Sequence, residues 1–297
     1  MIYLVDASVY IFRAYYGTAA EMVDQEGQAV HAVYGFARFL AELMERVQPR
    51  YIAVAFDQRL ASSFRNRIYP AYKANREPPP FDLVHQFERC RDWCRHLGVT
   101  ALVSPEYEAD DIIGTLACKM RREGVNSALI TRDKDLAQLI REGDMYWDYA
   151  NRDQLGYHDI ERHFGVAPER FADYLALTGD AVDNIPGVPG IGPKTAARLM
   201  KEFASLDEIY ADLERVGRLK FRGAAALIPR LREHRERVYL AQQLTCIQCS
   251  MPLDINVGSL RRRPPDMDAL MGFYDFHRFG PMLRMQSERL ARMPLGY

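Results

Sequence analysis

Residues 2–6 read Ile2-Tyr3-Leu4-Val5-Asp6, a short apolar run that ends in a carboxylate. Comparable apolar runs occur at Tyr51–Phe56, Val99–Val103 and Ser127–Thr131. Continuous rather than alternating hydrophobicity is typical of strands buried on both faces, as in a parallel sheet covered by helices. A helical pattern at Ala32–Val47 separates the first two runs, and such strand–helix alternation indicates an α/β layered fold.

Acidic residues follow three of these runs. Asp6 closes the first, Asp57 closes the second, and Asp133 and Asp135 follow the fourth. Ligands of open parallel sheets bind beyond the carboxyl ends of the strands, so these acids are expected to meet in one crevice. Two further acidic clusters are candidates for the same crevice: Glu108, Asp110 and Asp111 before a helical pattern, and Asp180 and Asp183 in the second half of the chain.

A single aspartate in such a place has ordinary structural explanations, as a helix N-terminal acid or a cap. Many carboxylates in one crevice would repel one another unless cations bind there. Ligation by oxygen alone, without His or Cys, favours Mg²⁺ or Mn²⁺ over Zn²⁺. Paired divalent ions about 3.5–4 Å apart activate water and stabilise the leaving oxygen in phosphodiester cleavage. The acids therefore predict a two-metal hydrolytic site in which Mn²⁺ can replace Mg²⁺.

The segment from Gly187 to Ala197 reads Gly-Val-Pro-Gly-Ile-Gly-Pro-Lys-Thr-Ala-Ala, and it predicts a helix-hairpin-helix over 185–200. Its glycines let a phosphate approach backbone N–H groups, and the following helix N-terminus favours an anion. Such contacts carry no base information, so DNA binding would be independent of sequence. An NTPase phosphate loop is the alternative, but Pro193 interrupts its Gly-Lys pair and the surroundings are helical. The expected substrate-binding residues are Gly187, Gly190, Gly192, Lys194 and Thr195.

The second half of the chain is predicted to be helical. Short helical patterns are expected at Asp159–Phe164, Arg170–Leu177, Lys194–Glu202, Leu206–Asp212 and Arg230–Gln243, and another follows in the tail to about Leu290. We expect an α/β domain at 1–165, with a basic arch near 60–95, and a helical DNA-binding domain at 166–297 that includes the C-terminal tail.

Composition sets further limits. The chain has 297 residues, 39 Lys and Arg, 40 Asp and Glu and a net charge of −1. The average hides basic segments at 59–95 and 215–237, so it does not argue against DNA. No run approaches the ~18 apolar residues of a membrane span, and no signal peptide is predicted. The five scattered cysteines indicate a reduced cytoplasm and disfavour a zinc site.

In this order, the acidic motifs and the hairpin resemble the 5′–3′ exonuclease family: the N-terminal domain of bacterial DNA polymerase I, phage 5′ nucleases and, more distantly, the flap endonucleases. The resemblance covers nearly the whole chain, as a stand-alone version of that domain. It implies a PIN-like α/β domain, a helix-3-turn-helix DNA-binding region, and 5′–3′ exonuclease or flap endonuclease activity in replication or repair.

The resemblance also implies roles for residues. One metal would be held mainly by Asp57, Glu108 and Asp110, with Asp6 and Asp111 close by, and the other by Asp133, Asp135, Asp180 and Asp183. Asp57 and Asp133 are also counted among the catalytic residues. In the arch, Lys73 would polarise the scissile phosphate with Arg76 or Arg65 as its helper, and Tyr72 would stack on the terminal base.

The resemblance extends to partners and ions. The hairpin would hold a K⁺ ion against a DNA phosphate. DNA with a 5′ end, flap or branch is the expected substrate, RNA primer strands remain open, and a separate DNA polymerase is a candidate partner. We expect a monomer without a membrane partner.

Three alternatives remain at this point. A catalytically silent protein that binds 5′ ends or branched DNA would share these motifs, but the complete acidic set favours an enzyme. A haloacid-dehalogenase-like phosphatase would need Asp-x-Asp after the first strand, where this chain has Asp6-Ala7-Ser8. An RNA-cutting nuclease of the same acidic type is less compatible with the hairpin.

Overall fold

The computed structural model describes residues 1–18, 21–58 and 63–295 of the chain. One mixed sheet forms the centre of the first half, with strand order β3-β2-β1-β4-β5-β6. The strands are β1 (Ile2–Asp6), β2 (Tyr51–Asp57), β3 (Thr100–Ser104), β4 (Ser127–Ile130), β5 (Met145–Asp148) and β6 (Asp153–Leu155). All neighbouring strands are parallel except β5 and β6. The predicted α/β fold is confirmed.

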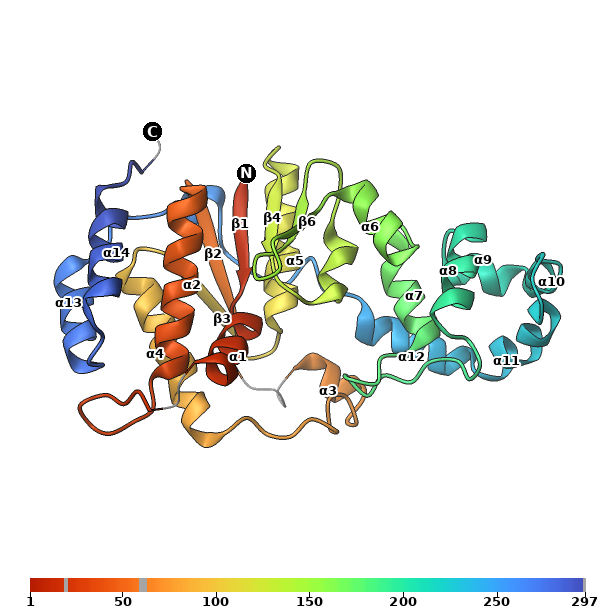
Figure 1. Ribbon diagram of the computed structural model, residues 1–297. Coiled ribbons are helices and arrows are strands. Elements are labelled where there is room, and N and C mark those ends of the chain that lie inside the picture. Colours follow the sequence, from red (N-terminus) through yellow and green to blue (C-terminus); the bar gives the residue numbers. More distant parts are fainter. Residues whose placement is uncertain (19–20, 59–62, 296–297) are drawn as a thin grey trace.

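Helices cover both faces of this sheet (Figure 1). They are α1 (Ala7–Gly17), α2 (His31–Val47), α4 (Phe81–His96) and α5 (Ala109–Arg122), with the short α3 (Phe64–Ile68) and the 3-10 helix η1 (Lys134–Leu139) at its edge. Alternate strand residues enter different cores. Leu4 packs with α5 and the helical half, whereas Val5 packs with α1 and α2. The continuous hydrophobicity of the strands thus has the predicted cause, because both faces are buried.

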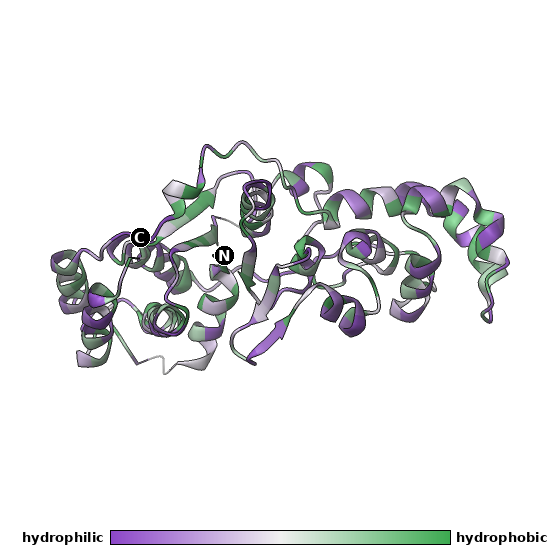
Figure 2. Ribbon diagram, turned by 90° about the horizontal axis from the view of Figure 1, so that it is seen from above, coloured by the Kyte–Doolittle hydropathy of each residue, from purple (hydrophilic) through white to green (hydrophobic). Residues whose placement is uncertain are grey.

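The second half is helical and extends from the sheet as an arm (Figures 1 and 2). Its helices are α6 (Tyr157–Phe164), η2 (Pro168–Arg170), α7 (Phe171–Thr178), α8 (Pro193–Glu202), α9 (Leu206–Ala211), α10 (Leu213–Gly217), η3 (Ala224–Ala226), α11 (Leu227–Glu233), α12 (Arg235–Thr245) and η4 (Val257–Leu260). The predicted helix at 230–243 is two helices, because the backbone leaves the helical region at His234.

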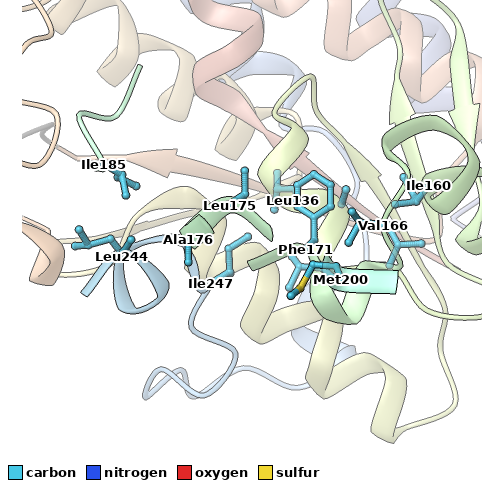
Figure 3. Packing of buried hydrophobic residues seen from close by; sticks show 14 of the residues in the cluster. Leu136, Ile160, Val166, Phe171, Leu175, Ala176, Ile185, Met200, Leu244 and Ile247 are labelled. Carbon is cyan, nitrogen blue, oxygen red and sulfur yellow. The ribbon is translucent and has the colours of Figure 1, made fainter. Parts of the chain in front are cut away.

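The two halves share one hydrophobic core. Figure 3 shows Leu136 of η1 beside Phe171 and Leu175 of α7, with Met200 of α8 nearby. The same cluster continues into α5 and the strands through Leu116. The position of the helical arm relative to the sheet is therefore set by buried apolar contact.

The tail returns to the α/β half. Helices α13 (Met267–Phe276) and α14 (Pro281–Arg292) lie outside α2 and α4 (Figure 1). Arg262 leads into them from a buried position and donates to the carbonyl of Pro294 at 2.9 Å. Although the tail was expected within the 166–297 unit, it packs on the first half. The division itself stays a prediction.

The segment expected to form an arch has two parts, and residues 59–62 of it lie outside the described chain. Residues 64–80 comprise α3 and a series of turns. The next helix, α4, packs against α2 and β3 through residues that include Cys90 and Trp93, so it belongs to the helical layer. Among the described residues, no helix is long and apolar enough to cross a membrane.

Candidate active site

Three strands deliver their terminal acids to one edge of the sheet. Asp6 and Asp57 are the last residues of β1 and β2, and Asp133 follows β4 as the N-cap of η1. Because β1 lies between β2 and β4, these acids are neighbours at the carboxyl edge. The strand order reverses here, with β2 on one side of β1 and β4 on the other, which is where open α/β sheets bind ligands.

The start of α5 lies against this edge. The backbone N–H of Ala109 donates to Oδ1 of Asp57 at 2.8 Å, and Ser8 Oγ donates to its Oδ2 at 2.6 Å. Glu108 occupies the N-cap position of α5, and Asp110 lies in its first turn. The predicted helix start is confirmed, and it brings these two acids to Asp57.

Four acids in the site have raised pKa values. Burial, followed by the charges of Asp57 and Asp133, raises the pKa of Asp6 to about 7. Burial and neighbouring carboxylates also raise the pKa of Asp110 and Asp135. The pKa of Asp133 is raised chiefly by burial. These carboxylates repel one another, so a cation placed among them would relieve an unfavourable charge.

Other acids in the same crevice already have basic partners. Lys73 Nζ lies 2.9 Å from Glu108 Oε2, and Lys134 Nζ lies 2.6 Å from Asp180 Oδ2. Arg76 forms an ion pair with Asp183. Burial acts to raise the pKa of Glu108 and of Asp180, but their lysine partners outweigh it and both pKa values are lowered.

Asp111 and Arg65 form a buried ion pair below the site. Two guanidinium nitrogens of Arg65 donate to the two carboxylate oxygens of Asp111 at 2.7 and 2.8 Å. Asp111 also accepts the backbone N–H groups of Glu108 and Gln248, at 3.0 and 2.9 Å. Arg65 uses its remaining donors on the carbonyls of Leu244 and Cys246. A metal-ligand role for Asp111 and a catalytic role for Arg65 do not fit this saturated arrangement.

Tyr72 is placed differently from its expected stacking role. Its ring is 3% exposed and belongs to the buried core. Its hydroxyl lies 3.1 Å from Glu108 Oε2 and 3.3 Å from Asp183 Oδ2. Tyr72 also lines the cavity beside Lys73, but so little of it is exposed that this geometry suits a residue that orients two carboxylates, and the stacking role stays a prediction.

The turn at residues 69–76 docks on the loop after α7. Lys73 N donates to the carbonyl of Asp183 at 2.9 Å, and Asn184 Nδ2 donates to the carbonyl of Ala71 at 2.7 Å. Lys73 and Asn184 both adopt positive φ angles, 56° and 55°. Such a conformation is uncommon outside glycine and is often associated with functional sites. The contact joins the basic segment of the first half to the acids of the second.

A cavity of about 640 Å³ opens beside Asp57 and the turn at residues 69–76. Its polar wall includes Asp57, Lys73 and Arg76, and its apolar wall includes Phe12 and Phe87. The two rings lie edge to face with centroids 5.8 Å apart. A chamber with cations on one side and aromatic rings on the other suits an unpaired nucleotide.

The donor set suits a hard divalent cation, because every candidate ligand is a carboxylate. The buried Oδ1 of Asp135 has no hydrogen-bond partner, which is the state of an oxygen that a cation would satisfy. Within the described residues, however, no three acidic, histidine or cysteine side chains are arranged as a ready ligand set. Lys73 and Lys134 occupy an oxygen of Glu108 and of Asp180, so a cation bound to either of those oxygens would displace the lysine.

The predicted hairpin lies between α7 and α8. A Cβ on Gly187 would meet the carbonyl carbon of Thr178 at 2.3 Å, so this glycine permits two backbone segments to touch. In contrast, Gly192 has open space around it and is the N-cap of α8. Gly192 and Lys194 are exposed, which suits phosphate contact. Because the hairpin follows a helix, the NTPase alternative is wrong.

Some residues around the site were missed from the sequence. Ser8 contacts Asp57, and Thr131 donates to Asp6 at 2.9 Å. Lys134 lies between two predicted acids, which was an available signal. Arg230 of α11 lies over the hairpin, with Nη1 3.5 Å from the carbonyl of Pro189. The two residues are 41 positions apart in the sequence, so no local pattern could predict their contact.

Comparisons with known proteins agree with this arrangement. The family model "5′-3′ exonuclease, N-terminal resolvase-like domain" matches residues 1–165, and "5′-3′ exonuclease, C-terminal SAM fold" matches residues 166–268. The chain is 38% identical to the thermostable DNA polymerase I of Thermus filiformis over 280 residues, covering 94% of this chain and 32% of that protein. It therefore spans about a third of the length of such relatives.

A shorter relative matches over most of both chains. The 5′-3′ exonuclease of Buchnera aphidicola subsp. Acyrthosiphon pisum is 32% identical over 258 residues, 86% of this chain and 90% of that protein. Among solved structures, T5 5′-exonuclease with bound zinc has a TM-score of 0.66 at 19% identity, covering 98% of each chain. The catalytic core of Rad2 with DNA substrate has a TM-score of 0.62 at 16% identity, covering 97% of this chain and 89% of that one.

These likenesses to solved structures concern the fold, whereas the family matches concern the sequence itself. Together the two models cover the sheet, the acidic edge and the hairpin. The phosphatase alternative is thereby excluded, and the resemblance drawn from the acidic motifs and the hairpin is confirmed. This chain belongs to the 5′–3′ exonuclease family.

Proposed function

We propose that this chain hydrolyses phosphodiester bonds of DNA at a 5′ end, flap or branch, with Mg²⁺ as the natural cofactor and Mn²⁺ as a substitute. One observation carries the proposal. Acids with raised pKa values gather at the strand ends, and a cavity with Lys73 and Arg76 on its wall opens at the neighbouring Asp57. Negative charge suited to divalent ions and positive charge suited to a phosphate thus lie side by side.

Similar solved structures support the choice of ligands. T5 D15 protein was co-crystallised with metal ions, and a single-residue variant of T5 D15 flap endonuclease was crystallised with DNA and metal ions. Rad2 was crystallised with DNA substrate. We propose that this chain also binds divalent ions and DNA, because it has carboxylates and basic side chains at the same sheet edge.

The acids divide into two groups that could each hold an ion. Asp6, Asp57, Glu108 and Asp110 surround the ends of β1 and β2, and Asp133, Asp135, Asp180 and Asp183 surround η1 and the loop after α7. Bound ions would supply an activated water and stabilise the leaving oxygen. Asp111 is left out of both groups because Arg65 and two backbone N–H groups occupy its oxygens.

Lys73 and Arg76 would position the scissile phosphate. Both line the cavity and pair with acids of the site, so they can exchange a carboxylate for a phosphate oxygen when metal takes their present partner. A fixed cation at the developing charge stabilises the transition state more than the ground state. Tyr72 would keep Glu108 and Asp183 oriented during this exchange.

The helical half would hold the duplex through its backbone. Exposed Gly190, Gly192, Lys194 and the adjacent Thr195 border the start of α8, where backbone N–H groups favour a phosphate. Arg230 adds a positive charge at the same turn. The backbone carbonyls of the hairpin would also bind a K⁺ ion at this turn. Arg230 contacts one of these carbonyls, that of Pro189. The basic residues at 215–237 would extend the contact along the duplex.

Further expectations complete the proposal. RNA primer strands would be accepted where they present a 5′ end, and a separate DNA polymerase would supply the branched substrate. The DNA polymerase I relative matches this chain over about a third of its own, longer sequence, which supports that pairing. We propose a monomer, and a reduced cytoplasmic setting that fits five unpaired cysteines.

A protein that binds 5′ ends without cutting them is the second candidate. Lys73 and Lys134 occupy acids that a metal would need, and no ready ligand set exists among the described residues. In a silent protein these lysines would stay in place and the site would hold DNA by charge alone.

The decisive experiment is cleavage of a 5′-labelled flap duplex with Mg²⁺, Mn²⁺ or EDTA. Wild type is compared with Asp133→Asn and with Asp254→Asn, an exposed aspartate outside the site. Metal-dependent release of short 5′ products, lost in Asp133→Asn and kept in Asp254→Asn, supports the nuclease. Tight flap binding without cleavage in either metal rejects it in favour of the silent protein.

A further inference from the structure

Two cysteines meet away from the acidic site. Cys118 lies on α5, and Cys249 lies in the segment 246–251 that follows α12. This segment runs along α5, where Thr115 Oγ1 donates to the carbonyl of Gln248 at 3.2 Å. Gly114 lacks a side chain where the segment crosses: a Cβ there would lie 3.3 Å from Cys249 Sγ. Cys118 is one helical turn further along the same face, so its thiol lies next to that of Cys249. The Cys249 thiol donates to the carbonyl of Ile247 at 3.7 Å.

The surroundings of Cys118 favour its thiolate. Arg121 Nη1 lies 3.8 Å from Cys118 Sγ. The neighbouring Cys249 thiol is the first cause that lowers the pKa of Cys118, to about 6, and Arg121 and Arg141 add to it against the effect of burial. The neighbouring Cys118 thiol, together with burial, raises the pKa of Cys249. Cys118 is also only partly buried, so a small reagent can reach it.

The other cysteines lack this combination. Cys90 and Cys94 are fully buried on α4, and burial raises the pKa of both thiols. Cys246 is exposed as a whole residue, but its thiol group is largely surrounded by protein, and this burial raises its pKa as well. A nucleophilic thiolate beside a second thiol is the arrangement found in redox-active dithiols.

We propose that Cys118 and Cys249 form a redox-sensitive dithiol that low-molecular-weight disulfides, such as glutathione disulfide, convert into an intramolecular disulfide. The Cys118 thiolate attacks one sulfur of the oxidant, breaks its S–S bond and releases one thiolate. Cys249 then loses its proton and attacks the mixed disulfide at the Cys118 sulfur. The disulfide between Cys118 and Cys249 forms, and the second thiolate of the oxidant leaves. The proton released by Cys249 and protons from solvent convert the two released thiolates into thiols. The protein loses two electrons, which the oxidant gains.

The crosslink would join two elements that meet at the buried ion pair. Gln248 N donates to Asp111 Oδ1 at 2.9 Å, and Arg65 donates to the carbonyls of Leu244 and Cys246. A disulfide between α5 and this segment also closes a long loop, which restricts the unfolded chain. We therefore expect oxidation to stabilise the protein, with a rise in Tm of roughly 5 °C that dithiothreitol reverses.

The test uses the full chain. Brief alkylation with iodoacetamide at neutral pH, followed by peptide mass spectrometry, should modify Cys118 faster than any other cysteine. Incubation with glutathione disulfide should remove two hydrogens from the protein mass, and non-reducing digestion should yield the Cys118–Cys249 peptide pair together with the Tm rise.

Two variants sharpen this test. Cys249→Ser should accumulate a glutathione adduct on Cys118 without a crosslink, whereas Cys246→Ser should crosslink as the wild type does. The proposal is overturned if Cys118 reacts no faster than Cys246. It is equally overturned if folded wild type yields no disulfide, or one that involves Cys246. Neither variant touches the acidic site, so these outcomes are independent of nuclease activity.

Discussion

Individual carboxylates in the acidic crevice differ by their partners. Asp6, Asp110, Asp133 and Asp135 have raised pKa values, whereas Glu108 and Asp180 are paired with lysines and have lowered ones. Sequence reasoning treated all of these acids alike. The distinction depends on which basic side chain reaches which oxygen, and it gives single substitutions different expected effects.

Lys73→Met should reduce catalysis, and it should also lower stability because Glu108 loses its nearest charged partner. The side chain lines the cavity beside Asp57, and loss of one stabilising cation at a transition state costs on the order of 10²–10³ in rate. Single-turnover cleavage of a flap duplex measures it. Lys119→Met, on the far part of α5, is the matched control and should cleave at the wild-type rate. A wild-type rate for Lys73→Met would remove this residue from the mechanism.

Arg65→Met should act on stability first. It leaves the Asp111 carboxylate buried without its charged partner, which costs about 3–5 kcal/mol of the free energy of unfolding. Arg76→Met, which breaks the more exposed pair with Asp183, should cost about 1 kcal/mol or less. Urea denaturation of both variants measures the difference. Equal stability of the two proteins, with slower cleavage by Arg65→Met alone, would restore the catalytic role expected from the sequence.

At the scale of elements, the sequence pattern predicted the strands and helices whose formation depends on neighbouring residues in the chain. The strands β1, β2 and β4 and the helices α2, α5 and α8 form where apolar runs or helical spacing indicated them. The short antiparallel pair β5–β6 was missed, because a strand of three or four residues at a sheet edge has too little pattern to detect. Helix α4 was read as part of a basic arch, since its buried face is narrow among many charges.

The hairpin glycines should separate into two classes. Gly187→Ala forces a Cβ into the backbone of Thr178, so we expect a loss of several kcal/mol in stability and of DNA binding with it. Gly192→Ala meets no atom within 4 Å and should keep the wild-type Tm. Thermal denaturation and flap binding of both proteins make the comparison. A weaker affinity for DNA in the stable Gly192→Ala protein would report directly on phosphate approach.

At the scale of the whole molecule, the sheet and the helical arm form one site. The loop after α7 supplies Asp180 and Asp183, the turn at 69–76 docks on it, and one hydrophobic core runs beneath both. Neither half alone holds the full acidic set. Folding and metal binding should therefore depend on each other through the charge gathered between the halves.

Stability should fall as pH rises when divalent metal is absent. An acid whose folded pKa lies above its unfolded value binds protons more tightly when folded. For Asp6 the difference spans 3.8 to about 7, so the metal-free protein should lose stability progressively across that window. Mg²⁺ should then raise Tm more at about pH 8 than at about pH 5. Scanning calorimetry with EDTA or Mg²⁺ at both pH values tests this. Asp110→Asn should reduce the difference between the Mg²⁺-induced Tm rises at the two pH values. An equal Mg²⁺ effect on Tm at both pH values would contradict a shared metal site among these acids.

The sequence alone determined the parallel sheet, the acids at its strand ends, the hairpin before α8 and membership in the family. Each of these depends on a local cause, namely continuous apolar runs, residue spacing or a Gly-Pro turn. Tertiary structure alone decided that Asp111 and Arg65 neutralise each other, that Tyr72 is buried, that Arg230 lies over the hairpin and that the tail packs on α2 and α4. These facts depend on contacts between residues far apart in the chain, where partner and burial, rather than residue type, set the role of a side chain.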